Sequence, residues 1–191
     1  MLTVLVIDES RSRAGEICAG LALAGYQVAA ILAGAENLTS EVERLQPDVI
    51  LIDTDSPTRD TLENLAAMNK DMPRPVVIFT QEDGQETIRD AVRAGVSAYV
   101  VDGLDPRRIK PIVDVARARF EDTQSLRREL DQLSRKLSDR KLVDQAKGVL
   151  MKARGLDEDA AYHAMRKLAM ERGQTMAKVA RDVIDMARVL L

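Results

Sequence analysis

The sequence has few of the residues that mark several large protein classes. Its 191 residues include one Cys, one His, no Trp, three Tyr and two Phe. The single cysteine, Cys18, excludes an intrachain disulfide, and its apolar neighbours predict a buried position on a helix. With so few aromatic residues, aliphatic side chains must fill the core, and a stacking platform for single-stranded nucleic acid is not expected.

Long apolar runs and common enzyme motifs are absent as well. No run approaches the roughly 20 residues that a helix needs to cross a bilayer. The opening MLTVLVIDES lacks the basic segment of a signal peptide and predicts a first strand. The sequence contains no CxxC, HExxH, P-loop or GxGxxG motif. We therefore expect a cytoplasmic protein that contacts no membrane and is not an enzyme.

Charge is distributed unevenly, although the net charge is only −3. Residues 1–106 carry 8 Lys and Arg against 18 Asp and Glu, a net charge of −10. Residues 107–191 carry 20 against 13, a net charge of +7. A solvated, charged helix surface would explain the basic part most simply. The size of the contrast favours two separate tasks, with the basic part suited to a polyanion.

The first 106 residues alternate between apolar runs and amphipathic helical segments. The runs are rich in β-branched residues and nearly continuous, which predicts parallel strands buried on both faces. They lie at 3–8, 26–31, 48–53, 75–80 and 98–102. Two of the helical segments end in Gly. The pattern predicts a doubly wound α/β domain with a five-stranded parallel sheet, whose functional crevice lies at the carboxyl ends of the strands.

From residue 107 onward the pattern is helical alone. Leu126, Leu130, Leu133 and Leu137 form a narrow apolar stripe on an otherwise polar helix. Such a stripe predicts dimerisation through a short parallel coiled coil. The alternative is a single helix that docks on its own α/β domain.

The last third of the chain predicts a small three-helix module. Asp157 and Thr175 are suited to cap two further helices, and Gly173 to end the first of them. The expected core includes Met151, Met165, Met170 and Met176. The predicted organisation is thus an α/β domain at 1–106, a coiled-coil helix at 107–139 and a three-helix domain at 140–191.

Acidic residues gather where the predicted strands end. Asp8 and Glu9 follow the first strand and Asp53 the third, so their carboxylates should converge on one crevice. Converging carboxylates repel one another unless a hard cation such as Mg²⁺ joins them. A metal-bound aspartate can then accept a phosphoryl group, and Thr80 would offer a hydroxyl to one of its oxygens.

These residues resemble a two-component receiver domain across 1–106. The resemblance implies roles for six positions, which are the phospho-acceptor Asp53, the metal-binding pair Asp8 and Glu9, the switch residues Thr80 and Tyr99, and Asp55 as a backbone-carbonyl ligand of the metal. We expect no required cofactor, with Mg²⁺ as the ion that the pocket could hold.

One position departs from the receiver pattern. Receivers carry a Lys after the last strand, and its ammonium neutralises the phosphoryl group, whereas this chain has Asp102 there. An anion at that place opposes phosphoryl binding by several kcal/mol in a poorly screened site, on the order of Coulomb energies. We therefore expect a degenerate receiver that acts through protein interaction.

The stretch RKLVDQAKGVLMKARGLDEDAAYHAMRKLAMERGQTMAKVARDVI resembles the ANTAR domain, an RNA-binding antitermination module. Gly148 within it costs about 1 kcal/mol relative to Ala in a helix, which indicates close approach of another backbone or of a ligand. The expected RNA-contacting residues are Arg140, Lys141, Lys147, Gly148, Tyr162, Arg166 and Lys167. For Tyr162, the alternative is a core aromatic with its hydroxyl at the surface.

A receiver, a coiled coil and an ANTAR domain in that order resemble the AmiR/NasR/NasT antiterminators, and the NasT-like nitrate-assimilation regulators most. That family resemblance implies a homodimer that binds paired hairpins in leader mRNA and prevents a terminator from forming. It also implies control by a separate protein that senses nitrate or nitrite. The alternative is a DNA-binding two-component response regulator activated by phosphorylation at Asp53.

Overall fold

A five-stranded parallel sheet forms the centre of the first part of the chain. The computed structural model describes residues 1–9, 13–101 and 105–190. The strands run in the order β2-β1-β3-β4-β5, and every neighbouring pair is parallel. Their bounds are β1 Thr3–Asp8, β2 Gln27–Leu32, β3 Val49–Asp53, β4 Val76–Thr80 and β5 Ala98–Val101. The predicted doubly wound α/β fold is confirmed.

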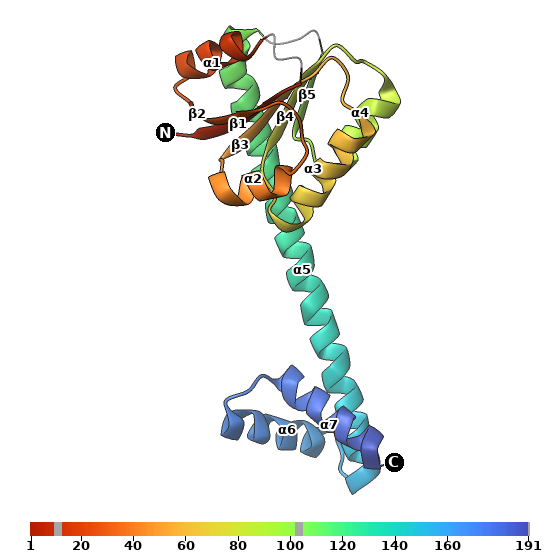
Figure 1. Cartoon of the computed structure of the whole chain (residues 1–191). Helices are drawn as coiled ribbons and strands as arrows, with labels where there is room; N and C mark the ends of the chain where they lie inside the picture. The colour runs from red at the N-terminus through yellow and green to blue at the C-terminus, as the bar shows by residue number, and fades with distance from the viewer. Residues whose placement is uncertain (10–12, 102–104, 191) are drawn as a thin grey trace. The chain divides into compact units, whose positions relative to one another are not determined.

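Helices cover both faces of this sheet (Figure 1). On one face, Ile7 and Ile52 pack with residues of α2, α3 and α4 such as Leu65. On the other face, strand residues such as Phe79 pack with α1 and with the start of α5, where Val113 is fully buried. The helices are α1 Ala14–Leu23, α2 Leu38–Leu45, α3 Arg59–Asp71, α4 Gln85–Arg93, α5 Ile109–Arg154, α6 Glu158–Arg172 and α7 Met176–Leu190. Burial on both faces explains why the strands read as continuous apolar runs.

Glycines follow α1 and α4, as the sequence predicts. Gly25 and Gly95 have φ angles of +80° and +93°, which L residues with a side chain rarely adopt. At Gly95 an added Cβ would lie 2.5 Å from the amide nitrogen of Asn69. That amide donates a hydrogen bond to the carbonyl oxygen of Ala94 and so fixes the end of α4. These turns return the chain to β2 and β5.

The chain divides into two compact units, Met1–Gln124 and Ser125–Leu191. A short 3-10 helix, Pro106–Arg108, precedes α5, which continues without a break from the first unit into the second. In the second unit the end of α5 packs with α6 and α7. The buried core of this unit is Ala146, Met165, Ala169, Val179 and Ala180.

The predicted helix caps of the second unit are confirmed. The side chain of Asp157 accepts a hydrogen bond from the backbone N–H of Ala160 at the start of α6. Gly173 ends that helix with φ +60°. The backbone N–H of Lys178 donates a hydrogen bond of 3.3 Å to the hydroxyl of Thr175 at the start of α7. These caps satisfy backbone groups that a helix end leaves without a partner.

Several burial predictions were wrong. Met170 and Met151 are 74% and 39% exposed, although both were expected in the core with Met165 and Met176. The buried face of α6 repeats every four residues, from Ala161 through Met165 to Ala169, and Met170 lies one residue off that face. Cys18 lies on α1 as predicted but is only partly buried.

Within the described ranges, no helix is long and apolar enough to cross a membrane.

Candidate functional sites in the acidic pocket and the helical module

Asp8 and Asp53 meet at the carboxyl edge of the sheet. They are the last residues of β1 and β3 and stand opposite each other in the strand register. Their exposed fractions are 1% and 0%. Burial raises the pKa of Asp53 above its usual range; Arg13 opposes this shift, and the neighbouring charge of Asp8 adds to it. The predicted convergence of these two carboxylates is therefore observed.

A residue that the sequence reading missed, Arg13, enters this pocket. It precedes α1, and its Nε lies 2.9 Å from Oδ2 of Asp53. Its Nη2 lies 3.4 Å from Oδ1 of Asp55. The arginine therefore brings positive charge to the carboxylate that was expected to face a metal. Its position shortly after the first predicted strand was the available signal, because the functional crevice of such a sheet lies at the carboxyl ends of the strands.

Glu9 does not join Asp8 and Asp53 as an open carboxylate. Its Oε2 accepts a hydrogen bond of 2.7 Å from the hydroxyl of Thr54, and its Oε1 accepts one of 3.0 Å from the hydroxyl of Thr61. The predicted convergence of three carboxylates is thus wrong for the third one. Two hydroxyls from residues far along the chain hold it, and single-sequence periodicity carries no sign of such contacts.

Thr80 and Tyr99 are joined through the loop after β4. The hydroxyl of Thr80 donates to the carbonyl oxygen of Asp55 at 2.8 Å and accepts from the backbone N–H of Glu82 at 3.1 Å. The hydroxyl of Tyr99 donates to the carbonyl oxygen of Glu82 at 3.0 Å. Burial raises the pKa of Tyr99 above its usual range. Both predicted switch residues therefore belong to one hydrogen-bonded chain beside the pocket.

As these residues lie, they do not fit a Mg²⁺ site. The carbonyl oxygen of Asp55 already accepts from Thr80 and from the backbone N–H of Gln81 at 3.2 Å. Mg²⁺ requires several oxygen ligands in near-octahedral geometry. In the described parts of the chain, no group of three or more His, Cys, Asp or Glu is arranged to hold a metal ion. Asp102, the residue expected in place of the receiver lysine, lies outside the described residues.

The second unit brings only some of the predicted RNA-contacting residues together. Arg140, Lys147 and Tyr162 line one open pocket of about 440 Å³, formed by α5, α6 and the start of α7. Thr175 belongs to the same lining. The other predicted cations are exposed but do not line this pocket, namely Lys141, Arg166 and Lys167.

Lys147 is held by two carboxylates. Its Nζ lies 2.8 Å from Oδ1 of Asp144 one turn earlier in α5, and 2.7 Å from Oε1 of Glu158 in α6. The side chain is only 16% exposed. The hydrogen bond with Asp144, and then that with Glu158, raises the pKa of Lys147. Lys147 therefore links α5 to α6, a role that the sequence reading did not foresee.

Gly148 lies in open surroundings. A Cβ built there would have no neighbouring atom within 4 Å, so close approach of another backbone of this chain is not the reason for the glycine. That part of the prediction was wrong. Close approach of a ligand or of a second chain to Gly148 stays a prediction. Tyr162 is 40% exposed and packs edge-on against His163, with the ring centroids 6.0 Å apart.

The leucine stripe has no cover within the described chain. Leu126, Leu130, Leu133 and Leu137 are 61%, 65%, 56% and 63% exposed. Docking of this part of α5 on the chain's own α/β domain, the alternative that the sequence left open, stays a prediction. Four leucines spaced by three and four residues therefore present an apolar surface to solvent or to another molecule.

Two family models match this chain. The model of the response regulator receiver domain matches residues 4–114. The chain belongs to the response regulators. The model of the ANTAR domain matches residues 131–184, so this response regulator also carries the all-helical domain that its sequence resembles. The acidic pocket is thus the pocket of the receiver domain, and the unit with Lys147 and Gly148 contains the ANTAR domain.

Several named proteins are similar to this ANTAR response regulator. The transcriptional regulatory protein PdtaR of Mycobacterium tuberculosis is 29% identical over 161 residues, which span 84% of this chain and 78% of that protein. The nitrate regulatory protein of Klebsiella oxytoca is 35% identical over 83 residues, 44% of this chain and 21% of that protein. The aliphatic amidase regulator of Pseudomonas aeruginosa is 24% identical over 109 residues, 57% of this chain and 56% of that protein.

Solved structures support the receiver fold. A CheY-like receiver domain from Methanospirillum hungatei matches with a TM-score of 0.56 and 21% identity, over 64% of this chain and 98% of that one. The receiver domain of a modulated diguanylate cyclase from Desulfovibrio desulfuricans matches with a TM-score of 0.56 and 20% identity, over 63% and 97%. At such identities the likeness shows the fold alone.

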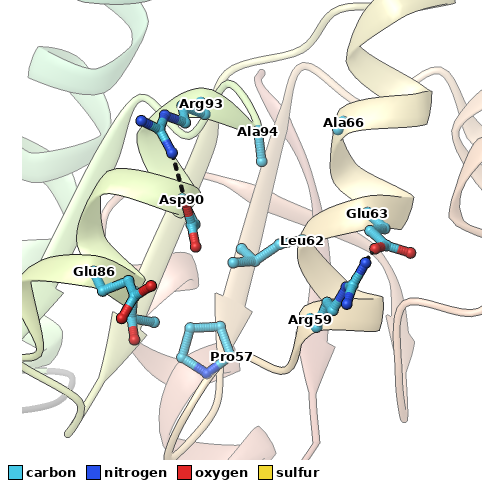
Figure 2. A pocket seen from close by; sticks show the side chains of 10 residues that line it. Pro57, Arg59, Leu62, Glu63, Ala66, Glu86, Asp90, Arg93 and Ala94 are labelled. Atoms are coloured by element: carbon cyan, nitrogen blue, oxygen red, sulfur yellow. Dashed lines mark hydrogen bonds and ion pairs between the residues drawn. The ribbon is translucent and has the colours of Figure 1, made fainter.

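A second hollow of the receiver domain is lined by none of the residues of the acidic pocket. It has a volume of about 620 Å³, and α3 and α4 form its walls (Figure 2). Arg59 pairs with Glu63 on one wall and Arg93 with Asp90 on the other, with Leu62 between them (Figure 2). None of the predicted site residues lines it. The volume of this hollow is therefore no sign that it is the functional site of the domain.

Proposed function

We propose that this ANTAR response regulator is a transcription antiterminator that binds paired hairpins in leader mRNA and prevents formation of a terminator. The match of the ANTAR domain to a helical unit with its own core carries the proposal. The basic balance of residues 107–191 supports it, because a polyanion is the partner that such charge favours. The receiver domain decides when the RNA-binding unit acts.

An all-helical domain can recognise only some parts of an RNA hairpin. The major groove of A-form RNA is too deep and narrow for side chains to read, so recognition falls on hairpin loops and on backbone phosphates. Exposed cations such as Arg166 and Lys167 supply affinity that depends on salt. Arg140 and Tyr162, which line one pocket, are suited to a phosphate and to an unstacked loop base. Specificity then comes from the loop.

A second copy of the chain is the partner that we propose for the leucine stripe. The four leucines are surrounded by Arg, Asp, Glu, Gln and Lys, as on the outer positions of a parallel coiled coil. Two ANTAR domains in one dimer would engage two adjacent hairpins. After the first hairpin binds, the second binding event becomes intramolecular, which raises affinity without any new contact.

Control by nitrate or nitrite is the regulatory part of the proposal. The similarity to the nitrate regulatory protein of Klebsiella oxytoca supports this input. In our proposal a separate sensor protein holds the receiver domain and releases it when the signal arrives. The receiver domain therefore acts by protein interaction and does not depend on a phosphoryl group at Asp53.

A gel-shift experiment on the whole chain tests RNA binding. The probes are transcripts of leader regions from the same genome that contain two adjacent short hairpins, and the matching duplex DNA serves as competitor. We expect a complex with the RNA that weakens steeply between about 50 and 200 mM salt and that resists the duplex. Preference for the duplex would instead support a DNA-binding response regulator, with α6 and α7 as its reading helices.

A further inference from the structure

The pocket of the receiver domain contains its own cation. The guanidinium of Arg13 contacts Asp53 at 2.9 Å and Asp55 at 3.4 Å. Asp53 has no exposed surface, and neither of its carboxylate oxygens accepts a hydrogen bond from a described residue. A buried carboxylate needs compensation by charge or by hydrogen bonds. Among the described residues, the ion pair with Arg13 is the compensation that Asp53 has.

Two other groups that a divalent cation would use, the Glu9 carboxylate and the Asp55 carbonyl, are already engaged. Both carboxylate oxygens of Glu9 accept hydrogen bonds from threonine hydroxyls, at 2.7 Å and 3.0 Å. The carbonyl oxygen of Asp55 accepts two hydrogen bonds, at 2.8 Å and 3.2 Å. A cation beside Asp53 would also lie against the guanidinium, which repels it. Arg13 and these hydrogen bonds therefore oppose metal binding together.

We propose that Arg13 is the built-in counter-ion of this pocket, so that its guanidinium replaces a divalent cation at Asp53. The receiver domain then keeps its arrangement without metal. The carboxylates become a cation site only when the guanidinium is removed. Arg13 is a positioning residue, because its guanidinium determines whether Asp53 faces an arginine or a divalent metal ion.

Mn²⁺ binding to the whole chain tests the proposal, with the electron paramagnetic resonance signal of free Mn²⁺ as the readout. We expect wild type to bind Mn²⁺ only at millimolar concentrations. Arg13→Met keeps the length of the side chain without its charge and should bind at least about tenfold more tightly. Arg13→Lys restores a cation and should behave like wild type. Arg13→Met combined with Asp53→Asn should lose the gain, which would assign the new site to Asp53.

Thermal unfolding gives a second readout that does not depend on the resonance signal. About 10 mM Mg²⁺ should raise the melting temperature of Arg13→Met more than that of wild type, since a ligand that binds the native state stabilises it. Arg13→Gln repeats the test if Arg13→Met does not fold. Equal Mn²⁺ affinity in wild type and both neutral variants would overturn the proposal. A gain that persists after Asp53→Asn would overturn it as well. RNA binding is not involved, so either proposal can fail alone.

Discussion

The phenol hydroxyl of Tyr26 lies 3.1 Å from a carboxylate oxygen of Asp114, although the two residues are 88 positions apart in the chain. Tyr26 immediately precedes β2, and Asp114 lies in the second turn of α5. Lys110 of the same helix lies over the tyrosine ring at 5.8 Å from its centroid. The start of α5 is therefore joined to the sheet by a polar contact as well as by apolar packing.

Tyr26→Phe should lower the free energy of unfolding by about 1 kcal/mol, the usual size of a lost hydrogen bond. Burial, and then the hydrogen bond to Asp114, raises the pKa of Tyr26 from 10.0 to about 12. The raised pKa makes a stabilising contribution that is complete below pH 10 and is lost as pH rises towards 12. Wild type should therefore lose stability over that range more steeply than Tyr26→Phe. Urea unfolding at a series of pH values measures this.

The matched control for Tyr26→Phe is Tyr162→Phe, since Tyr162 is 40% exposed. It should leave the stability at neutral pH unchanged. If Tyr26→Phe matched wild type at every pH, the contact with Asp114 would contribute nothing.

Gly148→Ala should separate stability from function. Because a Cβ at this position meets nothing within 4 Å, alanine should stabilise α5 by about 1 kcal/mol through helix propensity. If the open space at Gly148 admits a phosphate or a loop base, the same change should weaken RNA binding at least tenfold. Circular dichroism and a filter-binding assay give the two values. Ala153→Gly, at an exposed position later in α5, is the control and should lower stability while it leaves RNA affinity unchanged. Unchanged affinity in Gly148→Ala would exclude the glycine from the RNA surface.

Lys147 and the pair Arg166 and Lys167 should behave differently when they are replaced. Lys147→Ala removes the ion pairs with Asp144 and Glu158, so it should lower the melting temperature. Arg166→Ala with Lys167→Ala should leave the melting temperature unchanged, because both side chains are exposed. The double variant should weaken RNA binding at least tenfold and reduce the salt dependence by about two phosphate contacts. An unaltered salt slope would show that the RNA lies elsewhere.

Charge placed in the leucine stripe should dissociate the dimer. Leu130→Lys with Leu133→Lys puts two cations at positions that are 65% and 56% exposed in one chain but would be buried between two. We expect the dimer dissociation constant to rise at least about a hundredfold in analytical ultracentrifugation. The fold should not change, since the leucines support no packing within the described chain. Met170→Lys, at another exposed apolar position of the same unit, should leave the dimer intact. A monomeric wild type would refute the coiled coil.

Much of the fold could be predicted because its physical causes are local in sequence. A strand buried on both faces must be apolar at nearly every position, so five such runs indicate the sheet directly. Acidic residues that directly follow those runs, such as Asp8 and Asp53, must then share one edge. Helix ends could be predicted equally well from their capping residues, as Asp157 and Gly173 of α6 show. The division of the chain at residues 106 and 139 stays a prediction.

The rest of the site depends on contacts that periodicity does not encode. Arg13 contacts Asp53 across 40 residues of sequence. Glu9 is held by Thr54 and Thr61, whose hydroxyls are only located once β3 and α3 are in place. Lysine is a residue type that often contacts RNA, but in the fold Lys147 forms an ion pair with Glu158 of the neighbouring helix α6. In each case the sequence does not show which distant residue the side chain contacts in the fold.

Single-round transcription in vitro measures antitermination itself. The template carries a leader with two adjacent hairpins, the second of which overlaps a terminator, and the readout is the fraction of transcripts that pass the terminator. Purified wild-type protein should raise that fraction in proportion to hairpin binding, while Arg166→Ala with Lys167→Ala should not. Unchanged termination with wild-type protein bound to the transcript would contradict antitermination.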